Sequence, residues 1–180
     1  MEYVILGLLL IMPNTIYGIN KAFEQGISMF YSPSIGSLQS ASKRLLEKKL
    51  IESLETLENG RVKKILSITD AGTETFFKWM FEPLDEKNLE VSLLSRLYFM
   101  GLLPTKASKL NLLHQMVQNV RDSESQLEAV NQSLSNLDLP SAYQEIFFFQ
   151  RKVLHYGIDT HKYGIEWLEK LIQEIENTIA

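Results

Sequence analysis

The chain of 180 residues contains no cysteine, which excludes a disulfide framework and any metal site built on thiolate ligands. It also carries little excess charge, because 18 Lys and Arg stand against 22 Asp and Glu, for a net charge of −4. A protein that is basic all over, with a general attraction to nucleic acid or anionic lipid, is thereby excluded. The apolar fraction of 45% is ordinary for a globular protein with one good core or two small ones.

Long hydrophobic runs are lacking as well. The apolar stretch MEYVILGLLLIMP, residues 1–13, is far shorter than the roughly 20 residues that cross a bilayer. Its length is that of a secretion signal, but Glu2 stands where such signals carry cations and no small-x-small cleavage site follows. We interpret the stretch as a buried first helix and expect a cytoplasmic protein with no membrane contact.

Sequence signatures of catalysis are missing too. The chain has no Gly-x-Ser-x-Gly, no phosphate-binding loop, no paired-carboxylate constellation and no cysteine nucleophile. His155 and His161 are six residues apart, whereas a metal-binding pair on one helix face would be four apart. We therefore predict no enzyme, no cofactor and no metal, and interpret His114, His155 and His161 as solvated or locally bonded.

What the first 83 residues do contain is three helix patterns followed by a hairpin pattern. Helices are expected at about 2–11, from Asn14 or Thr15 to Gln25, and from Ser32, which would cap a helix with Pro33 at its first position. The segments LIESLETL (50–57) and VKKILSIT (62–69) are strand candidates around Asn59-Gly60, a strong hairpin signal. Thr69 then caps a fourth helix. This order predicts a winged helix-turn-helix, whose third helix enters the DNA major groove.

The stretch SPSIGSLQSASKRLLEKKLIE, residues 32–52, supports that interpretation. At about 100° per residue its apolar side chains fall on one side, which also includes Ser42 and Lys49, and small polar and cationic ones fall on the other. Such a solvated face is common on any helix, but the basic hairpin that follows strengthens the case for DNA. The expected DNA contacts are Ser37, Gln39 and Ser40 at base edges, Lys43 and Arg44 at phosphates or guanine, Arg61, Lys63 and Lys64 on the hairpin, and Tyr17 at a phosphate, for which simple packing is an equal alternative.

These motifs resemble the PadR-type transcriptional regulators. The resemblance lies in VILGLLL (4–10), Tyr17-Gly18-Ile19, the run Ser32 to Leu38 with Arg44 and Leu45 further on, LIES (50–53), and Thr69-Asp70-Ala71-Gly72 after the hairpin. Gln39-Ser40 stands where the family usually has Tyr-Pro, and Ile65 or Leu66 where it has an aromatic residue. The resemblance implies a homodimer held by C-terminal helices and, in some members, a response to small aromatic or planar molecules. The departures imply an altered operator or a loss of DNA binding.

From residue 84 onward the chain shows only helical patterns. The excess acid lies here, with nine Lys and Arg against thirteen Asp and Glu, whereas residues 1–83 have nine of each. A short helix is expected at about 88–103, followed by two long amphipathic helices with three-four apolar spacing, typical of a coiled coil. Packing against a second copy would bury their remaining apolar surface. This half resembles the longer, virulence-activator-like C-terminal domain of the same family.

This half also carries aromatic residues at helical spacing, in IFFFQ (146–150) and at Trp167. With Trp79 of the first half, they suggest an effector site at Trp79, Phe148 and Trp167. A place in the core or in a dimer interface is the more common role of such a stripe. The prediction is therefore a mainly α protein: a winged-helix DNA-binding domain over 1–83 and an all-α dimerisation domain over 84–180. Its expected function is that of a homodimeric transcriptional regulator on an inverted-repeat operator, with repression favoured over activation and double-stranded DNA as partner. The alternatives are a winged-helix protein-interaction module that has lost DNA binding, and an enzyme or ligand carrier that uses the aromatic helices.

Overall fold

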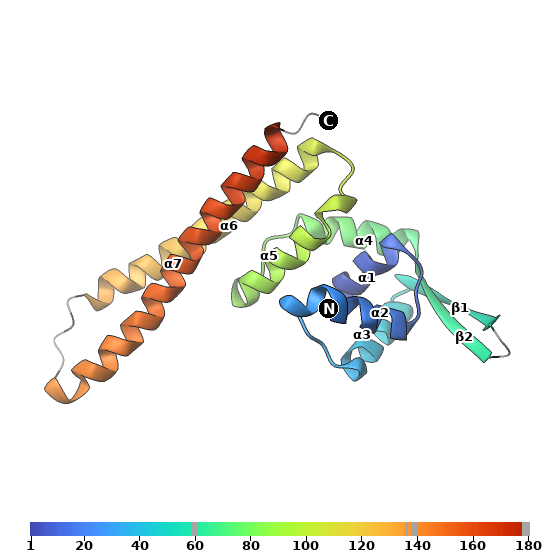
Figure 1. Ribbon diagram of the computed structural model, residues 1–180, viewed down its shortest axis with the longest axis horizontal. Helices are drawn as coiled ribbons and strands as arrows, with labels where there is room; N and C mark the ends of the chain where they lie inside the picture. The colour runs from blue at the N-terminus through green and yellow to red at the C-terminus, as the bar shows by residue number, and fades with distance from the viewer. Residues whose placement is uncertain (59–60, 136, 138–139, 178–180) are drawn as a thin grey trace. The chain divides into compact units, whose positions relative to one another are not determined.

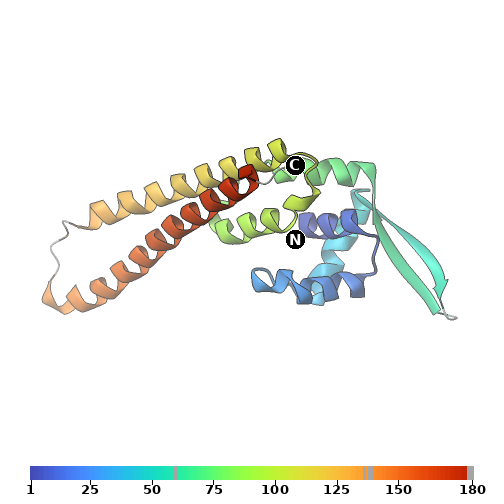
Figure 2. The same cartoon turned by 45° about the horizontal axis from the view of Figure 1, so that its top comes forward.

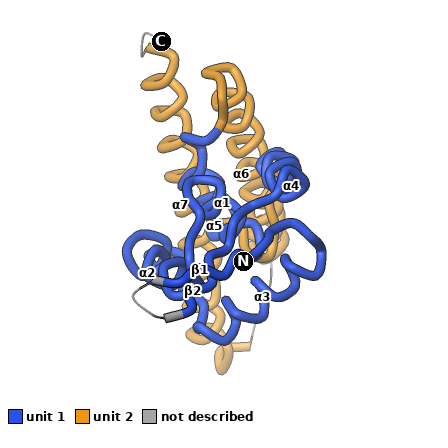
Figure 3. Tube along the Cα trace, turned by 90° about the vertical axis from the view of Figure 1, so that its right-hand side faces the viewer, with its two compact units in different colours: residues 1–82, 90–102 blue, residues 83–89, 103–180 orange. Residues whose placement is uncertain are grey.

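The computed structural model describes residues 1–58, 61–135, 137 and 140–177. They form two compact units, residues 1–82 with 90–102 and residues 83–89 with 103–180 (Figure 3). The first contains the short helices and the hairpin, and the second the long helices (Figure 1). The predicted class, a mainly helical chain with an N-terminal winged helix-turn-helix and long C-terminal helices, is confirmed.

The first two helices follow the capping and breaking residues of the sequence. Helix α1 (Glu2–Ile11) is buried on most sides, as its unbroken apolar pattern predicts. Helix α2 (Ile16–Gln25) begins after Thr15, whose hydroxyl accepts a hydrogen bond from the Gly18 N–H at 3.0 Å, and ends before Gly26. Its inner face is formed by Ile19 and Phe23, both buried.

Helix α3 (Ile35–Glu47) starts later than the sequence suggested. Ser34, not Ser32, is the capping residue, because its hydroxyl accepts the Ser37 N–H at 3.2 Å. The expected core residue Ile35 therefore occupies the first helical position and is 50% exposed. The buried face consists of Leu38, Ala41, Ser42 and Leu45.

A left-handed residue ends α3. Lys49 has φ 58°, and the N–H groups of Lys49 and Leu50 donate to the carbonyls of Leu46 and Leu45, each at 3.0 Å. This is a Schellman closure with lysine where glycine is usual. The helical spacing had placed Lys49 on the core face of the helix. In the structure Lys49 lies beyond the end of the helix and is exposed.

The wing is an antiparallel pair, β1 (Ile51–Glu58) and β2 (Arg61–Ile68). Its predicted Asn59-Gly60 turn lies outside the described residues. The register places Glu55 opposite Lys64 and Thr56 opposite Lys63. Because successive side chains alternate between faces, Lys63 and Lys64 lie on opposite faces of the wing.

Two further helices complete the first unit. Helix α4 (Asp70–Met80) is capped by Thr69, as predicted, and α5 (Leu89–Tyr98) returns to pack in the same unit. The phenyl ring of Phe99 meets that of Phe76 edge-on at 5.6 Å beside Gly7 of α1, where a Cβ would lie 2.7 Å from Phe99. Glycine at this position allows α1 to approach these rings.

The second unit is a helical hairpin. Helices α6 (Lys106–Leu134) and α7 (Ser141–Asn177) run antiparallel side by side (Figures 1 and 2). Two seams of α7 differ in burial. One packs on α6 through Ile158, Ile165, Leu168 and Ile172. The other, which we call the outer stripe, consists of Ile146, Phe149, Val153, Tyr156, Thr160, Tyr163 and Trp167 and is exposed.

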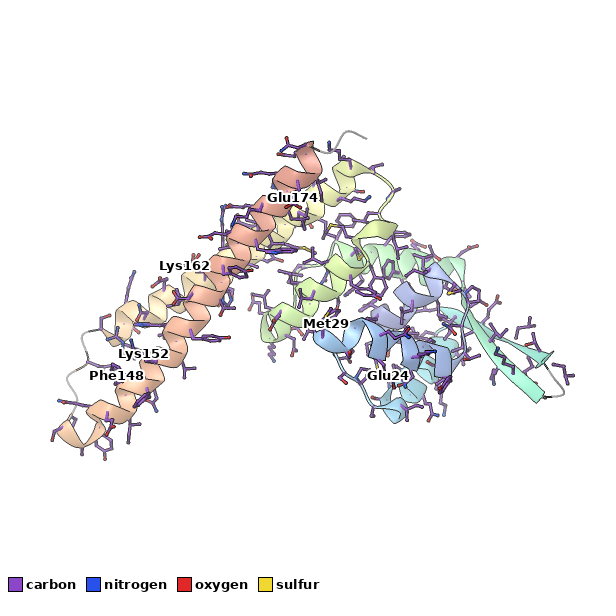
Figure 4. The ribbon with its side chains drawn as sticks, in the orientation of Figure 1. Glu24, Met29, Phe148, Lys152, Lys162 and Glu174 are labelled. Carbon is purple, nitrogen blue, oxygen red and sulfur yellow. The ribbon has the colours of Figure 1, made fainter. Side chains whose placement is uncertain are left out.

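Polar contacts join the two long helices. Lys162 Nζ lies 2.9 Å from Glu128 and 3.9 Å from Glu124 (Lys162 is labelled in Figure 4). The imidazole of His161 bonds to Ser123 Oγ at 3.0 Å, and that of His155 to Asn131 Oδ1 at 3.1 Å. These two histidines are locally bonded, as predicted. In the described part of the chain, no helix is both long enough and apolar enough to span a membrane.

Candidate nucleic-acid interface

The outer face of α3 centres on Gly36, Ser40, Lys43 and Glu47, which recur every three or four residues and are all exposed. Gln39 lies on one flank of this face and Arg44 on the other. At Gly36 an added Cβ would meet nothing within 4 Å, so the start of the helix offers a smooth surface to a partner. The predicted residues of α3 thus share one side of the helix.

The serine hydroxyls of this face donate to the helix itself. Ser37 Oγ donates to the Ser34 carbonyl at 2.7 Å, and Ser40 Oγ donates to the Gly36 carbonyl at 2.9 Å. Their protons are therefore engaged, while each oxygen keeps accepting capacity. At a base edge they are suited to accept from the amino groups of adenine or cytosine.

The two cations of α3 differ in their partners. Lys43 is 79% exposed and pairs with Glu47 at 3.9 Å along the helix, an interaction of small stabilising value. Arg44 Nε lies 2.6 Å from Glu2 Oε1, and Lys48 Nζ lies 2.9 Å from Glu2 Oε2. Arg44 thus links α3 to α1, and the sequence gave no sign of this contact because 42 residues separate the partners.

The carboxyl group of Glu2 is held ionised by these contacts. Partial burial raises its pKa, but hydrogen bonds from Lys48 and Arg44, with their positive charges, outweigh burial and lower the pKa overall. Glu2 also lies in the first turn of α1, where the helix dipole favours a negative charge.

On the wing, the predicted cations divide between the two faces. Lys63 lies opposite the neutral Thr56, whereas the side chain of the predicted Arg61 lies outside the described part of the chain. Lys64 lies opposite Glu55, so its charge is partly offset across the strands. Tyr17, near the start of α2, is 73% exposed.

The residues predicted for an effector lie in different surroundings. Trp79 is 8% exposed, stacked on Tyr3 with ring centroids 4.9 Å apart, and covered by the Arg96 guanidinium at 4.7 Å. Trp167 is 44% exposed on the outer stripe of α7. Trp79 thus belongs to the first unit and Trp167 to the second.

Phe148 lines an open depression of about 420 Å³ on the second unit. The depression is lined by Leu137, Gln144, Phe147, Phe148, Arg151, Lys152 and His155. Lys152 Nζ lies 5.1 Å from the centre of the Phe148 ring (both labelled in Figure 4). Basic and aromatic groups thus meet there, in the half of the chain that carries the excess acid.

Arg96 is a structural residue that the sequence interpretation overlooked. It is 2% exposed, and its guanidinium donates to the carbonyls of Trp79, Glu82 and Ser92 at 3.1–3.3 Å. Burial lowers the pKa of this guanidinium. Its signal in the sequence was an arginine within the otherwise uncharged, mostly apolar stretch LLSRLYFM (93–100).

A family model described as virulence activator alpha C-term matches residues 92–176. The match falls on the half where the sequence predicted such a domain, and the PadR-type motifs precede it over residues 4–72. Residues 92–176 are therefore similar to the virulence activator alpha C-terminal domain, as the sequence predicted.

Several solved structures are similar to this chain. Bacillus subtilis PadR in complex with operator DNA is 21% identical with a TM-score of 0.44, over 95% of this chain and 97% of that one. The same protein in complex with p-coumaric acid is 20% identical with a TM-score of 0.42, over 98% and 96%. A PadR-like transcriptional regulator from Bacillus cereus is 21% identical with a TM-score of 0.43, over 97% and 94%. Curated proteins give no match to this chain.

Proposed function

We propose that the protein is a homodimeric, sequence-specific DNA-binding transcriptional regulator that seats α3 in the major groove of an inverted-repeat operator. The observation that carries this proposal is the outer face of α3, where Gly36, Ser40 and Lys43 are exposed together. A helix in the groove needs small residues where the backbone comes close, polar groups for base edges and cations for phosphates. Gln39 and Ser37, on the two flanks, extend the same surface.

The wing then holds the adjacent DNA backbone. Lys63, exposed on the face of the two-stranded sheet away from Lys64, can follow one phosphate strand. Arg61, whose side chain lies outside the described part of the chain, keeps its predicted role at the adjacent backbone. Lys64 points to the other face and lies opposite Glu55, so we assign it the weaker contribution. Tyr17, exposed near the start of α2, is assigned to a phosphate beside the groove.

The outer stripe of α7 supports the homodimer. Its members recur with spacings of three and four, the pattern of a helix that packs against a partner helix. Phe149 is 61% exposed, Val153 73% and Tyr156 75%, an unusual extent of apolar exposure along one line. A two-fold dimer reads two half-sites, which is why the proposed operator is an inverted repeat. The expected repression needs only that the bound dimer occlude a promoter.

The test is fluorescence anisotropy of the purified protein with duplexes from the region upstream of its own gene, against scrambled duplexes, over a salt series. Sequence-preferring binding that weakens steeply with salt supports the proposal. Lys43→Ala should weaken binding and flatten the salt slope by about one counterion, while Lys170→Ala, which changes an exposed lysine of the second unit, is the matched control. The proposal would be contradicted if the protein formed a folded dimer whose DNA binding showed neither salt dependence nor sequence preference.

A protein-interaction module is the second candidate function, and the acidic neighbours of the α3 cations favour it. Glu47 pairs with Lys43, and Glu2 pairs with Arg44 and Lys48, so the face is less positive than its lysine and arginine content suggests. Under this candidate the anisotropy series shows no DNA preference in any salt.

For an effector, we propose the depression beside Phe148 as the binding site and an anion with a flat apolar part as the ligand class. Arg151 and Lys152 would hold the negative charge, and the phenyl rings of Phe147 and Phe148 the flat part. Calorimetric titration with benzoate tests this proposal, with Lys152→Ala as the variant that should weaken binding. Equal heats from both proteins would contradict it. Trp79 and Trp167 remain predicted effector contacts.

A further inference from the structure

The first turn of α1 carries a carboxylate that holds two cations of the proposed recognition helix. Glu2 uses one oxygen for Arg44 and the other for Lys48, at 2.6 and 2.9 Å. The Glu2 side chain is 22% exposed, whereas those of Arg44 and Lys48 are 51% and 57% exposed. The acid is therefore sheltered while both cations remain accessible from the solvent side.

Arg44 lies at the edge of the surface assigned to DNA. It follows Ser40 by one turn and Ser37 by two, so its side chain is a neighbour of both serines on the surface of α3. Lys43, at the centre of the outer face, pairs with the exposed Glu47 of its own helix at 3.9 Å. Of Lys43 and Arg44, Arg44 is the cation that forms an ion pair with an acid of another helix, Glu2 of α1.

We propose that Glu2 is a specificity-determining residue for DNA binding, because it competes with DNA phosphates for Arg44 and Lys48. This inference rests on the proposed function. Phosphate contacts are the same for every DNA sequence, so they tighten specific and non-specific binding alike. A carboxylate that holds Arg44 and Lys48 lowers this sequence-independent attraction and leaves discrimination to the base-edge residues.

Counterion release makes the competition measurable. An arginine already neutralised by Glu2 releases no condensed counterion when it reaches a phosphate, whereas a liberated arginine adds about 0.9 to the slope of log affinity against log salt. The affinity should change modestly, since a half-exposed ion pair contributes about 0.2–1 kcal/mol. Loss of the competitor then tightens non-specific binding roughly 1.4- to fivefold at low salt.

The experiment measures the binding of Glu2→Gln and wild-type protein to a short random-sequence duplex by anisotropy, from about 50 to 200 mM salt. We expect Glu2→Gln to bind more tightly and with a slope steeper by about one. Arg44→Gln in the Glu2→Gln background should remove the part of the gain that Arg44 supplies and leave the part from Lys48, whereas Arg44→Gln alone should have little effect. Glu74→Gln is the matched control, because Glu74 is an exposed acid of α4 that takes no part in these ion pairs.

Two outcomes would overturn the inference. Equal slopes for Glu2→Gln and Glu74→Gln would show that only net charge matters. Weaker binding by Glu2→Gln, with a lower melting temperature, would show that Glu2 instead positions α3 for DNA. Failure of the proposed function is distinguishable from both, because then Lys43→Ala would leave the salt dependence of wild-type binding unchanged and no duplex would be preferred.

Discussion

The buried guanidinium of Arg96 provides a stringent test of how the first unit is held together. Its Nε donates to the Trp79 carbonyl at 3.3 Å, and its two terminal nitrogens reach the carbonyls of Glu82 and Ser92 at 3.1 Å and the Ser92 hydroxyl at 2.5 Å. One side chain therefore joins the end of α4, the segment after it and α5. Arg96→Met removes all these bonds while keeping a chain of similar length.

The expected cost follows from the groups left behind. Three carbonyls lose a donor, at about 1–3 kcal/mol for each buried group. The cation–π contact with the Trp79 ring is lost as well, worth about 2 kcal/mol when desolvated. Methionine in turn avoids the desolvation of a buried charge, which offsets several kcal/mol. We expect a net loss of about 2–4 kcal/mol, or roughly 10–25 °C in melting temperature for a unit of this size.

Urea denaturation followed by tryptophan fluorescence measures this loss. Both proteins should carry Trp167→Phe, so that Trp79 reports on the first unit alone. The matched control is Arg44→Met, because Arg44 is half exposed on α3 in the same unit and pairs with Glu2. A loss below about 1 kcal/mol for Arg96→Met, no larger than that of the control, would refute the reasoning.

Three more predictions follow from backbone geometry and titration. Gly7→Ala should lower the free energy of unfolding by about 1–3 kcal/mol, because the added methyl group overpacks against two phenylalanine rings, and urea midpoints check this. Gly36→Ala has open space around its Cβ, so it should fold at least as stably as wild type but bind DNA more weakly, and urea midpoints and anisotropy check these two effects. Lys49→Gly should raise the free energy of unfolding by up to about 1 kcal/mol, because glycine adopts the observed positive φ without strain, and an unchanged or lower melting temperature would contradict this. Because the pKa of Glu2 is lowered in the folded state, its stabilising contribution is complete above the ordinary carboxyl pKa of about 4.3 and disappears as the pH falls through the lowered value. The stability difference between wild type and Glu2→Gln should accordingly be constant near neutral pH and vanish in acid, and a difference that grows in acid would show the sign to be wrong.

Within the proposed interface, the sequence predicted which residues share the outer face of α3 but not what they contact. Helical spacing was enough to group Ser40 and Lys43, because side chains three apart on a helix are neighbours whatever packs behind them. The same spacing wrongly placed Ile35 in the core, since the cap at Ser34 moved the helix start and left the first turn exposed. The spacing also assigned Arg44 to DNA, because it gave no indication that Arg44 pairs with Glu2 on α1.

Local chemistry in the sequence determined the element order, several caps and the two-sided pattern of the long helices. Thr15 and Thr69 cap where predicted because a capping hydroxyl needs only the N–H three residues ahead. Tertiary structure alone decided the Glu2–Arg44 contact, the burial of Arg96 and the return of α5 to the first unit. These depend on groups brought together across 14–42 residues of chain, and no local propensity encodes a contact that exists only after the helices have packed.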